Sequence, residues 1–355
     1  MKKKFLLAAS AAVVMLSSCQ KELPFYQDEL MMVDFGKPNV ELSSLTKAGG
    51  LLENTAFPTT WDFKVSAYDH VGNNAVINAD TVSYSTKWSA AGAPYYWPVG
   101  NVNKAGEAIN TALKFVAFAP ASTLPGTFAY STAPTISSTG VSGSLAVSKD
   151  TANQVDFLYS APKDFSKGNN VGLTFKHGMT NVVFKAKAAA EYGTGDNKKE
   201  IQIVSIDLNN VYSQGSFVTT DTIIWTPSNP IKYAINNTKQ NSSTFTEAGA
   251  ASYSAGLTLT TSYQQFGDKH IFIPQSLSAV TGTNAKSAAT VDVTVLVNGV
   301  PYYYKGIELT SLQNAVTTWK DGSRVTYNMT VGLSEIIFDA PVVTDWDNNT
   351  PSKEL

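Results

Sequence analysis

The chain has 355 residues with 26 basic and 28 acidic side chains, three histidines and one cysteine, for a formal net charge of -2. Hydrophobic residues make up 43% of the chain and aromatic residues 11%, which is enough apolar material for packed cores and excludes a disordered stalk. Arg324 is the sole arginine, and a mildly acidic surface of this kind argues against a nucleic-acid partner, which requires a cationic face.

The N-terminus has the pattern of an export signal. Three lysines precede an apolar run, residues 5–16, that is too short to span a bilayer as a permanent helix. The next residues, Leu16-Ser17-Ser18-Cys19, resemble the lipobox read by the bacterial lipoprotein signal peptidase. We therefore predict that residues 1–18 are a signal peptide and that Cys19, which has no disulfide partner, anchors the mature chain to outer-membrane lipid. The alternative is an ordinary signal peptide followed by a chance cysteine.

Short runs that alternate apolar and polar residues dominate the chain after residue 60. A period of two with one apolar face is typical of half-buried antiparallel strands. Asn298-Gly299 lies between two such runs and predicts a hairpin, because a type I′ turn needs positive φ at both central residues. The predicted fold class is all-β, with sandwiches as its simplest form. The clearest runs are residues 61–68, 113–118, 182–186, 201–208, 291–297, 300–305 and 324–331.

Helical patterning is scarce, and the chain has one prominent break. Residues 107–113 and 309–319 are each predicted as a short helix or turn at most. The turn-rich stretch 160–170 separates two series of strands, so we place a domain boundary near residue 168. The polar stretch 232–256 is predicted as a long loop. The expected organisation is a signal peptide at 1–18, an N-terminal segment at 19–47, and antiparallel β-domains at 48–168 and 169–355.

The sequence shows no motif with recognisable catalytic chemistry. His70, His177 and His270 are far apart and have no metal-ligand spacing, and His177 is interpreted as a structural histidine within a strand. We expect no enzymatic activity, no cofactor and no metal. The alternative is a glycan-active enzyme with a carboxylate pair. Its candidates each lie at a strand end or face where solvation accounts for them: Asp62, Asp69, Asp156, Asp207 and Asp345.

Clustered aromatic residues are the other feature that bears on function. Tyr95-Tyr96-Trp97-Pro98 follows Trp88, and Tyr302-Tyr303-Tyr304 lies in a predicted strand. Exposed rings on a sheet can stack on sugars, and this reading makes the protein a surface lipoprotein that binds host or bacterial glycans. The favoured reading is that alternate members face the core and the others cover the sheet.

Seven short segments follow the lipobox along the chain, and their order is informative. The most recognisable are Tyr95-Tyr96-Trp97-Pro98 with the strand 113–120 after it, and Leu173-Thr174-Phe175-Lys176-His177. The others are residues 63–68, 156–160, 206–215, 272–275 and 319–327. Together these segments resemble the fimbrillin family of pilus subunits and related surface lipoproteins, over about residues 60 to 346.

The resemblance implies two tandem antiparallel β-sandwich domains of transthyretin-like topology. It implies a structural or adhesive subunit of a fimbrium at the cell outer membrane, with other copies or other pilus subunits as partners. It also implies assembly by strand exchange after a protease removes an N-terminal segment. Here the cut is expected between Lys47 and Ala48, whereas family members commonly carry Arg at this point. Residues 31–35 are the strand expected to fill the groove before the cut.

The strand donated to the next subunit is expected to come from residues 334–346. Its candidate residues are Ile336, Phe338, Val342 and Trp346. Removing a strand leaves unpaired N–H and C=O groups beside an apolar groove, and a strand from another subunit satisfies both. Pro341 is expected to block one ladder bond within this donor.

Overall fold

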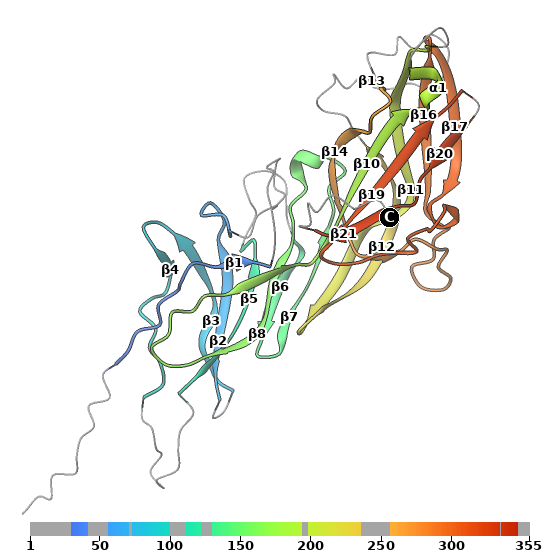
Figure 1. Ribbon diagram of the computed structural model, residues 1–355. Helices are drawn as coiled ribbons and strands as arrows, with labels where there is room; N and C mark the ends of the chain where they lie inside the picture. Colours follow the sequence, from blue (N-terminus) through green and yellow to red (C-terminus); the bar gives the residue numbers. More distant parts are fainter. Residues whose placement is uncertain are drawn as a thin grey trace, which may run out of the picture.

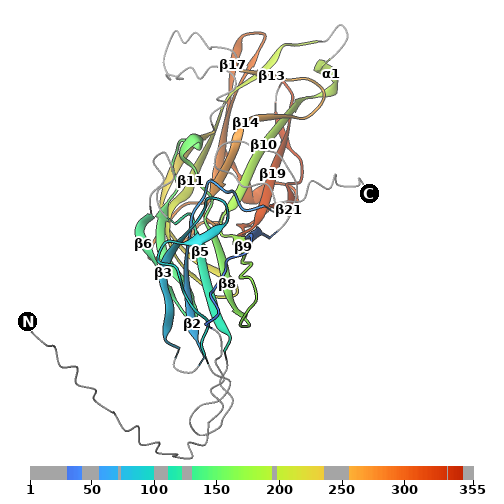
Figure 2. The same ribbon diagram turned by 90° about the vertical axis from the view of Figure 1, so that its left-hand side faces the viewer.

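The computed structural model describes residues 30–41, 56–70, 73–99, 111–121, 130–193, 198–235, 256–333 and 335–346. Strands dominate these residues, which confirms the all-β prediction. Figures 1 and 2 show an elongated molecule with β2–β8 at one end and β13–β20 at the other. Helix in the described ranges is confined to α1 (Ala190–Gly193) and the 3-10 turns η1 (Thr151–Asn153) and η2 (Leu309–Ser311).

The N-terminal half is built on a seven-stranded sheet with the order β1-β9-β8-β5-β2-β3-β4. Its neighbours are antiparallel, except that β1 runs parallel to β9. The alternating runs predicted from the sequence form β2 and β5, both at the centre of this sheet. The bounds are β1 (Asn39–Val40), β2 (Phe63–Asp69), β3 (Ala75–Tyr84), β4 (Trp88–Ala90), β5 (Leu113–Ala119), β8 (Leu158–Phe165) and β9 (Thr174–His177).

The C-terminal half is a two-layer sandwich. One layer has the order β14-β10-β19-β20, with β21 also paired to β19. It consists of β10 (Thr180–Ala188), β14 (Gln264–Phe272), β19 (Ser323–Val331), β20 (Ile336–Phe338) and β21 (Val342–Asp345). The facing layer contains β16 (Thr290–Val297), β17 (Val300–Glu308), β12 (Ile223–Ile235) and β13 (Leu257–Thr258), together with part of β11 (Ile201–Thr219). A two-stranded sheet, β15 (Gln275–Ser276) with β18 (Thr318–Trp319), completes this half.

The hairpin predicted at Asn298-Gly299 is confirmed. Val297 pairs with Val300 across the turn, so β16 and β17 are joined by two residues. Asn298 has φ 48° and Gly299 has φ 80°, the positive values that a type I′ turn requires. The same side-chain alternation that predicted the two strands places Val291, Val293 and Val295 in the core.

The 19-residue strand β11 connects the two halves. Its first part pairs with β16, and its second part pairs with β7 (Gly140–Ala146), which in turn pairs with β6 (Tyr130–Ser137). β12 follows β11 along its other side. Strands that precede residue 168 therefore share a sheet with strands that follow it. The boundary at residue 168 stays a prediction.

Three apolar cores follow one another along the molecule. The N-terminal core packs on one face of the first sheet, and the C-terminal core fills the sandwich of β10, β19, β11 and β16. A middle core combines residues from both halves, including Phe118, Phe157, Phe217, Ile271 and Trp346. Alternate residues of β5 serve two of these cores, because successive strand residues point to opposite faces.

Two predictions about local structure need correction. In the stretch 309–319, predicted as a short helix or turn, only Leu309–Ser311 forms a 3-10 turn, and Thr318–Trp319 is a strand. In the predicted loop 232–256, residues 232–235 continue β12, because Tyr233 and Ile235 are buried on alternate positions. In the predicted segment 107–113, residues 107–110 lie outside the described ranges and Leu113 begins β5.

Candidate assembly site

Residues 30–41, here called the resident strand, lie between two walls of the N-terminal half. The first wall is the stretch Tyr95-Tyr96-Trp97. The Val33 N–H donates to the Tyr95 carbonyl (N···O 2.8 Å), and the Trp97 N–H donates to the Met31 carbonyl (2.9 Å). This exchange is antiparallel, with Met32 opposite Tyr96. The wall that accepts the strand is the aromatic stretch singled out in the sequence.

The second wall is residues 171–175, on the opposite side of the resident strand. The Val171 N–H donates to the Asp34 carbonyl at 2.9 Å, and the Gly36 N–H donates to the Val171 carbonyl at 3.1 Å. Farther along, the Asn39 N–H donates to the Leu173 carbonyl at 2.9 Å, where β1 runs parallel to β9. Because it is hydrogen-bonded on both sides, the resident strand is an internal strand and not an edge strand.

The side chains of the resident strand alternate between core and solvent. Val33, Phe35 and Val40 are buried in the N-terminal core, whereas Asp34 and Asn39 are exposed. The Phe35 ring packs edge-on against Phe63 and Phe115, each with a centroid distance of 6.2 Å. Removing the strand would leave an apolar slot with a row of backbone polar groups along each side.

The resident strand is interrupted in its middle. Hydrogen bonds to the second wall leave from Gly36 and resume at Asn39, one residue later than a regular alternation would give. Pro38, which has no N–H, lies in this interval and is buried. The slot therefore accepts a proline at this position without losing a ladder bond.

The first wall is held by the half-buried carboxylate of Asp80 on β3. The Tyr95 hydroxyl donates to Asp80 Oδ2 at 3.0 Å, and the Gly92 N–H donates to the same oxygen at 2.7 Å. Burial, together with the hydrogen bond to Asp80, raises the pKa of Tyr95, so the hydroxyl stays a donor at neutral pH. Trp88 and Trp97 add apolar contact behind the wall, being 5% and 2% exposed.

The predicted donor strand lies in the C-terminal half, at the edge of its five-stranded sheet. β20 and β21 both pair antiparallel with β19, on one side only in the sheet order. Of the predicted donor residues, Phe338 and Trp346 are buried, and Ile336 and Val342 are half-buried. The segment therefore makes one ladder in its present position, whereas the resident strand makes two.

The end of this segment is anchored by a buried cluster that the sequence analysis missed. The Trp346 ring stacks on the His177 ring, with a centroid distance of 4.6 Å and an angle of 8° between the planes. His177 Nδ1 is hydrogen-bonded to Asp156 Oδ2, and both residues are buried. The interpretation of His177 as structural agrees with this contact. Asp156 was predicted to be solvated, and this prediction is wrong because its side chain is buried and paired with His177.

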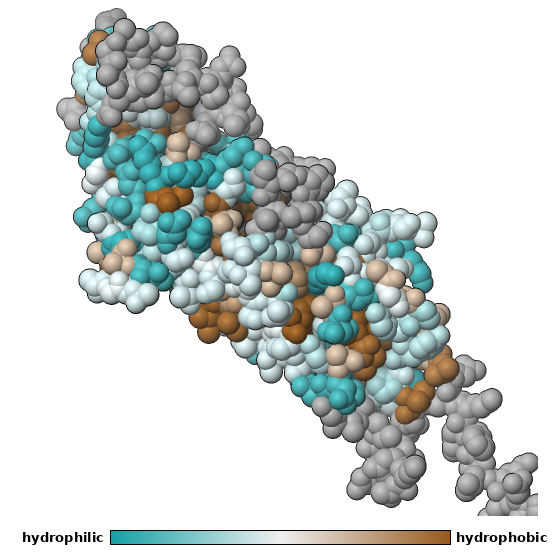
Figure 3. All heavy atoms as spheres, turned by 180° about the vertical axis from the view of Figure 1, so that it is seen from behind, coloured by the Kyte–Doolittle hydropathy of each residue, from teal (hydrophilic) through white to brown (hydrophobic). Residues whose placement is uncertain are grey.

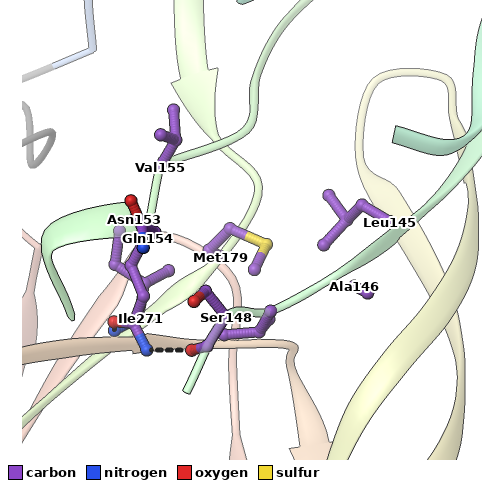
Figure 4. A pocket seen from close by; sticks show the side chains of 9 residues that line it. Leu145, Ala146, Ser148, Asn153, Gln154, Val155, Met179 and Ile271 are labelled. Atoms are coloured by element: carbon purple, nitrogen blue, oxygen red, sulfur yellow. Dashed lines mark hydrogen bonds between the residues drawn. The ribbon is translucent and has the colours of Figure 1, made fainter. Parts of the chain in front are cut away.

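A small hollow between the two halves is braced by Gln154. Its Nε2 donates to the Ser148 carbonyl at 2.9 Å, and its Oε1 accepts the Ile271 N–H at 2.7 Å. Figure 4 shows Gln154 between these residues, with the Met179 and Leu145 side chains toward the hollow. The amide thereby joins the η1 region to β14, and the hollow is part of the packing between the halves.

The other predicted residues are placed as follows. Cys19, Lys47 and Ala48 lie outside the described residues. The predicted sugar-stacking platform does not form, because Trp88 and Trp97 are buried and Tyr96 is 40% exposed. On edge strand β17, Tyr302 and Tyr303 are 41% and 48% exposed. On the face shown in Figure 3, apolar residues gather in separate patches among hydrophilic surface.

Within the described residues, no group of three or more His, Cys, Asp or Glu side chains is arranged to hold a metal ion. In the same part of the chain, no helix is long and apolar enough to cross a membrane.

The comparison with known families decides the classification. The model of the fimbrillin-like family matches residues 53–346. The chain belongs to this family. The resemblance carried by Tyr95–Pro98 and Leu173–His177 is thereby confirmed, and these two motifs of the fimbrillin-like chain form the two walls around the resident strand. No curated protein matches the chain in sequence.

Two of the solved structures compared below, a fimbrial protein and a cell adhesion protein, share the fold of this chain at low sequence identity. A fimbrial protein from Bacteroides vulgatus has a TM-score of 0.58 at 14% identity, over 80% of this chain and 92% of that chain. A candidate cell adhesion protein from Bacteroides uniformis has a TM-score of 0.51 at 12% identity, over 89% and 99% of the two chains. The tip fimbrial protein Mfa3 from Porphyromonas gingivalis matches with a TM-score of 0.39 at 9% identity, over 81% and 94%.

Proposed function

We propose that this fimbrillin-like protein is an exported lipoprotein that acts as a structural or adhesive subunit of a cell-surface pilus, assembled by proteolysis and strand exchange. The observation that supports this assembly mode is the position of the resident strand. Residues 30–41 precede the candidate cleavage point at Lys47-Ala48, yet they form an internal strand of the N-terminal half. A cut at this point would turn an integral strand into a separate peptide that can be replaced.

The physical drive for replacement is the slot itself. An empty slot exposes unpaired N–H and C=O groups on both walls and an apolar floor that includes Phe63 and Phe115. A strand from another copy restores the ladders, and each buried side chain contributes roughly 1.5–3 kcal/mol. The C-terminal segment is the candidate donor because it is an edge strand with a single ladder.

Assembly is tested by placing a site-specific protease sequence between Lys47 and Ala48 of the purified protein. The uncut protein should be a monomer. The cut protein should form oligomers that survive dilution once the released peptide dissociates, and deleting residues 334–355 should stop their growth while the N-terminal half stays folded. Protein that remains monomeric after cutting at high concentration contradicts assembly by strand exchange.

The anchoring proposal rests on Cys19 and its lipobox, and it assigns the uncut protein to the cell outer membrane. Cys19→Ala should abolish both incorporation of labelled palmitate and membrane retention. A variant that still incorporates palmitate contradicts the proposal. Two tandem β-sandwich domains of transthyretin-like topology, divided near residue 168, complete the proposed organisation.

Adhesive partners are proposed to be host or bacterial surface glycans or proteins. Tyr302 and Tyr303 on β17, which are both exposed, are the residues proposed to stack on a sugar. A glycan array probed with the parent and with Tyr302→Ala tests this, and equal binding by both proteins argues against a sugar at β17.

A further inference from the structure

The two segments that compete for the slot share one sequence pattern. Leu-x-x-(Val/Ile)-x-Phe-x-x-Pro-x-Val occurs in residues 30–40 and again in residues 333–343. Leu, Phe, Pro and Val are identical at the matching positions, and the fourth position is Val in one segment and Ile in the other. Every match has the same offset of 303 residues, so the pattern defines a single register.

Four of the five shared positions are the ones that the slot buries, and the fifth, Leu30, is exposed. In the resident strand the buried residues are Val33, Phe35, Pro38 and Val40, and each has its counterpart in the C-terminal segment. The residues between them are exposed or half-buried, and there the two segments differ. The C-terminal segment therefore repeats the side chains that the resident strand buries in the slot.

Among these positions, the proline gives the strongest support for a single register. Pro38 lies where the hydrogen bonds to the second wall skip a residue, and Pro341 falls on the same position of the pattern. The C-terminal segment is interrupted at the same place in its present sheet, since β20 ends at Phe338 and β21 begins at Val342. Pro341 was expected to cost a ladder bond. In this register it would occupy the position of Pro38, where the resident strand donates no hydrogen bond to the second wall, so no bond would be lost.

We propose that residues 333–343 of a second copy enter the slot in the register and direction of residues 30–40, with Phe338 in the place of Phe35. This inference rests on the proposed strand exchange and adds its register. The Phe338 ring then packs edge-on against Phe63 and Phe115, and Ile336 takes the place of Val33.

This register differs from the one expected from the sequence. The earlier candidates Ile336, Phe338, Val342 and Trp346 assumed that Val342 faces the groove. In the matched register Val343 takes the buried place of Val40, and Val342 takes the exposed place of Asn39. Val343 is 52% exposed in its present sheet, so its side chain is free to serve the slot of another copy.

The register is tested first by a graft that needs no polymerisation. In the full chain, residues 30–40 are exchanged for the sequence of residues 333–343. The matched graft should fold, with a smaller loss in denaturation midpoint than Phe35→Ala causes. The control graft uses the sequence of residues 332–342, and a slip of one residue turns every side chain to the other face. A matched graft as unstable as the slipped one overturns the proposal.

The second test follows exchange itself in the chain with the protease site after Lys47. Val343→Asp should reduce the oligomer yield after cutting by at least about tenfold, because it places a charge in the core of the slot. Val342→Asp, its matched control, should leave the yield near that of the parent. The reverse result overturns the register but leaves strand exchange standing. Failure of the parent to polymerise counts against the proposed function, and the graft still decides the register.

Discussion

His177 and His270 are both buried, but their surroundings differ. His177 is hydrogen-bonded to Asp156 and covered by the Trp346 ring, so its imidazole has a carboxylate partner. His270 stacks on Phe272 with a centroid distance of 5.9 Å, and burial lowers its pKa to about 4. The first histidine holds the C-terminal segment against the middle core, and the second is kept neutral inside the C-terminal core.

His177→Ala should lower the free energy of unfolding by about 3–5 kcal/mol, because the Asp156 carboxylate would remain buried without its histidine. The matched control is His70→Ala, which removes a similar contact with Asp164 (3.0 Å) at a partly exposed site. That change should cost about 0–1 kcal/mol. Denaturant unfolding of the two variants measures the difference, and equal losses would show that the buried pair has no special role.

His270 should make the protein less stable in mild acid. Its pKa is about 4 in the folded state and about 6.5 in an unfolded chain, so the unfolded state binds the proton first as the pH falls. Stability is therefore full above pH 6.5 and declines between pH 6.5 and 4, by roughly 3 kcal/mol for this group. Unfolding curves at pH 5 and 7 should differ less for His270→Leu than for the parent, and an unchanged difference contradicts this assignment.

At the scale of elements, the resident strand should contribute strongly to the stability of the N-terminal half. Phe35→Ala removes a buried ring that contacts Phe63 and Phe115, and it should cost about 3–5 kcal/mol. The control is the preceding residue, Asp34→Ala, which loses an exposed contact with Lys87 (3.3 Å) worth about 0–1 kcal/mol. Thermal unfolding of uncut protein tests the pair. If Phe35→Ala matches Asp34→Ala, the strand is an accessory and not an integral part of the half.

Regular alternation of apolar and polar residues made the central strands predictable, whereas strands with irregular pairing were harder to delimit from the sequence. β2, β5, β16 and β19 were located because an apolar residue stands at every second position along each of them. β11 was expected to end at Leu208 but continues to Thr219. The pairing with β12 shifts between Leu208 and Val211, and Asn210 has φ 58°, so a local irregularity within one strand resembled a turn in the sequence.

The assembly site was only partly predictable, for a related reason. Its two walls were recognisable as motifs, and the family resemblance implied that residues 31–35 fill a groove, but the double ladder depends on long-range pairing that no local pattern reveals. Asp156 and His177 are 21 residues apart and meet only because β8 pairs with β9. The repeated pattern at 30–40 and 333–343 is visible in the sequence, yet its meaning depends on knowing which of its positions are buried.

At the scale of the whole molecule, the two halves are continuous through β11 and the middle core. Phe217 on β11 packs against Phe157, which directly precedes β8, with a centroid distance of 4.3 Å. Both residues belong to the middle core, which also contains Ile271 and Trp346 from the C-terminal half. Under the proposed strand exchange, this core would connect the slot of each subunit to the strand that it donates.

The halves should therefore unfold together. Phe184→Ala, a change wholly within the C-terminal core, should cost about 3–5 kcal/mol and lower amide-exchange protection in β5 and β19 by the same amount. Phe217→Ala should lower the free energy of unfolding by a similar amount, but it should also uncouple the unfolding of the two halves. β5 and β19 should then lose amide-exchange protection at different denaturant concentrations. Hydrogen exchange across a denaturant series distinguishes these outcomes. If Phe184→Ala weakens β19 and leaves β5 unchanged, the halves are independent, and the middle core is a contact between separate domains.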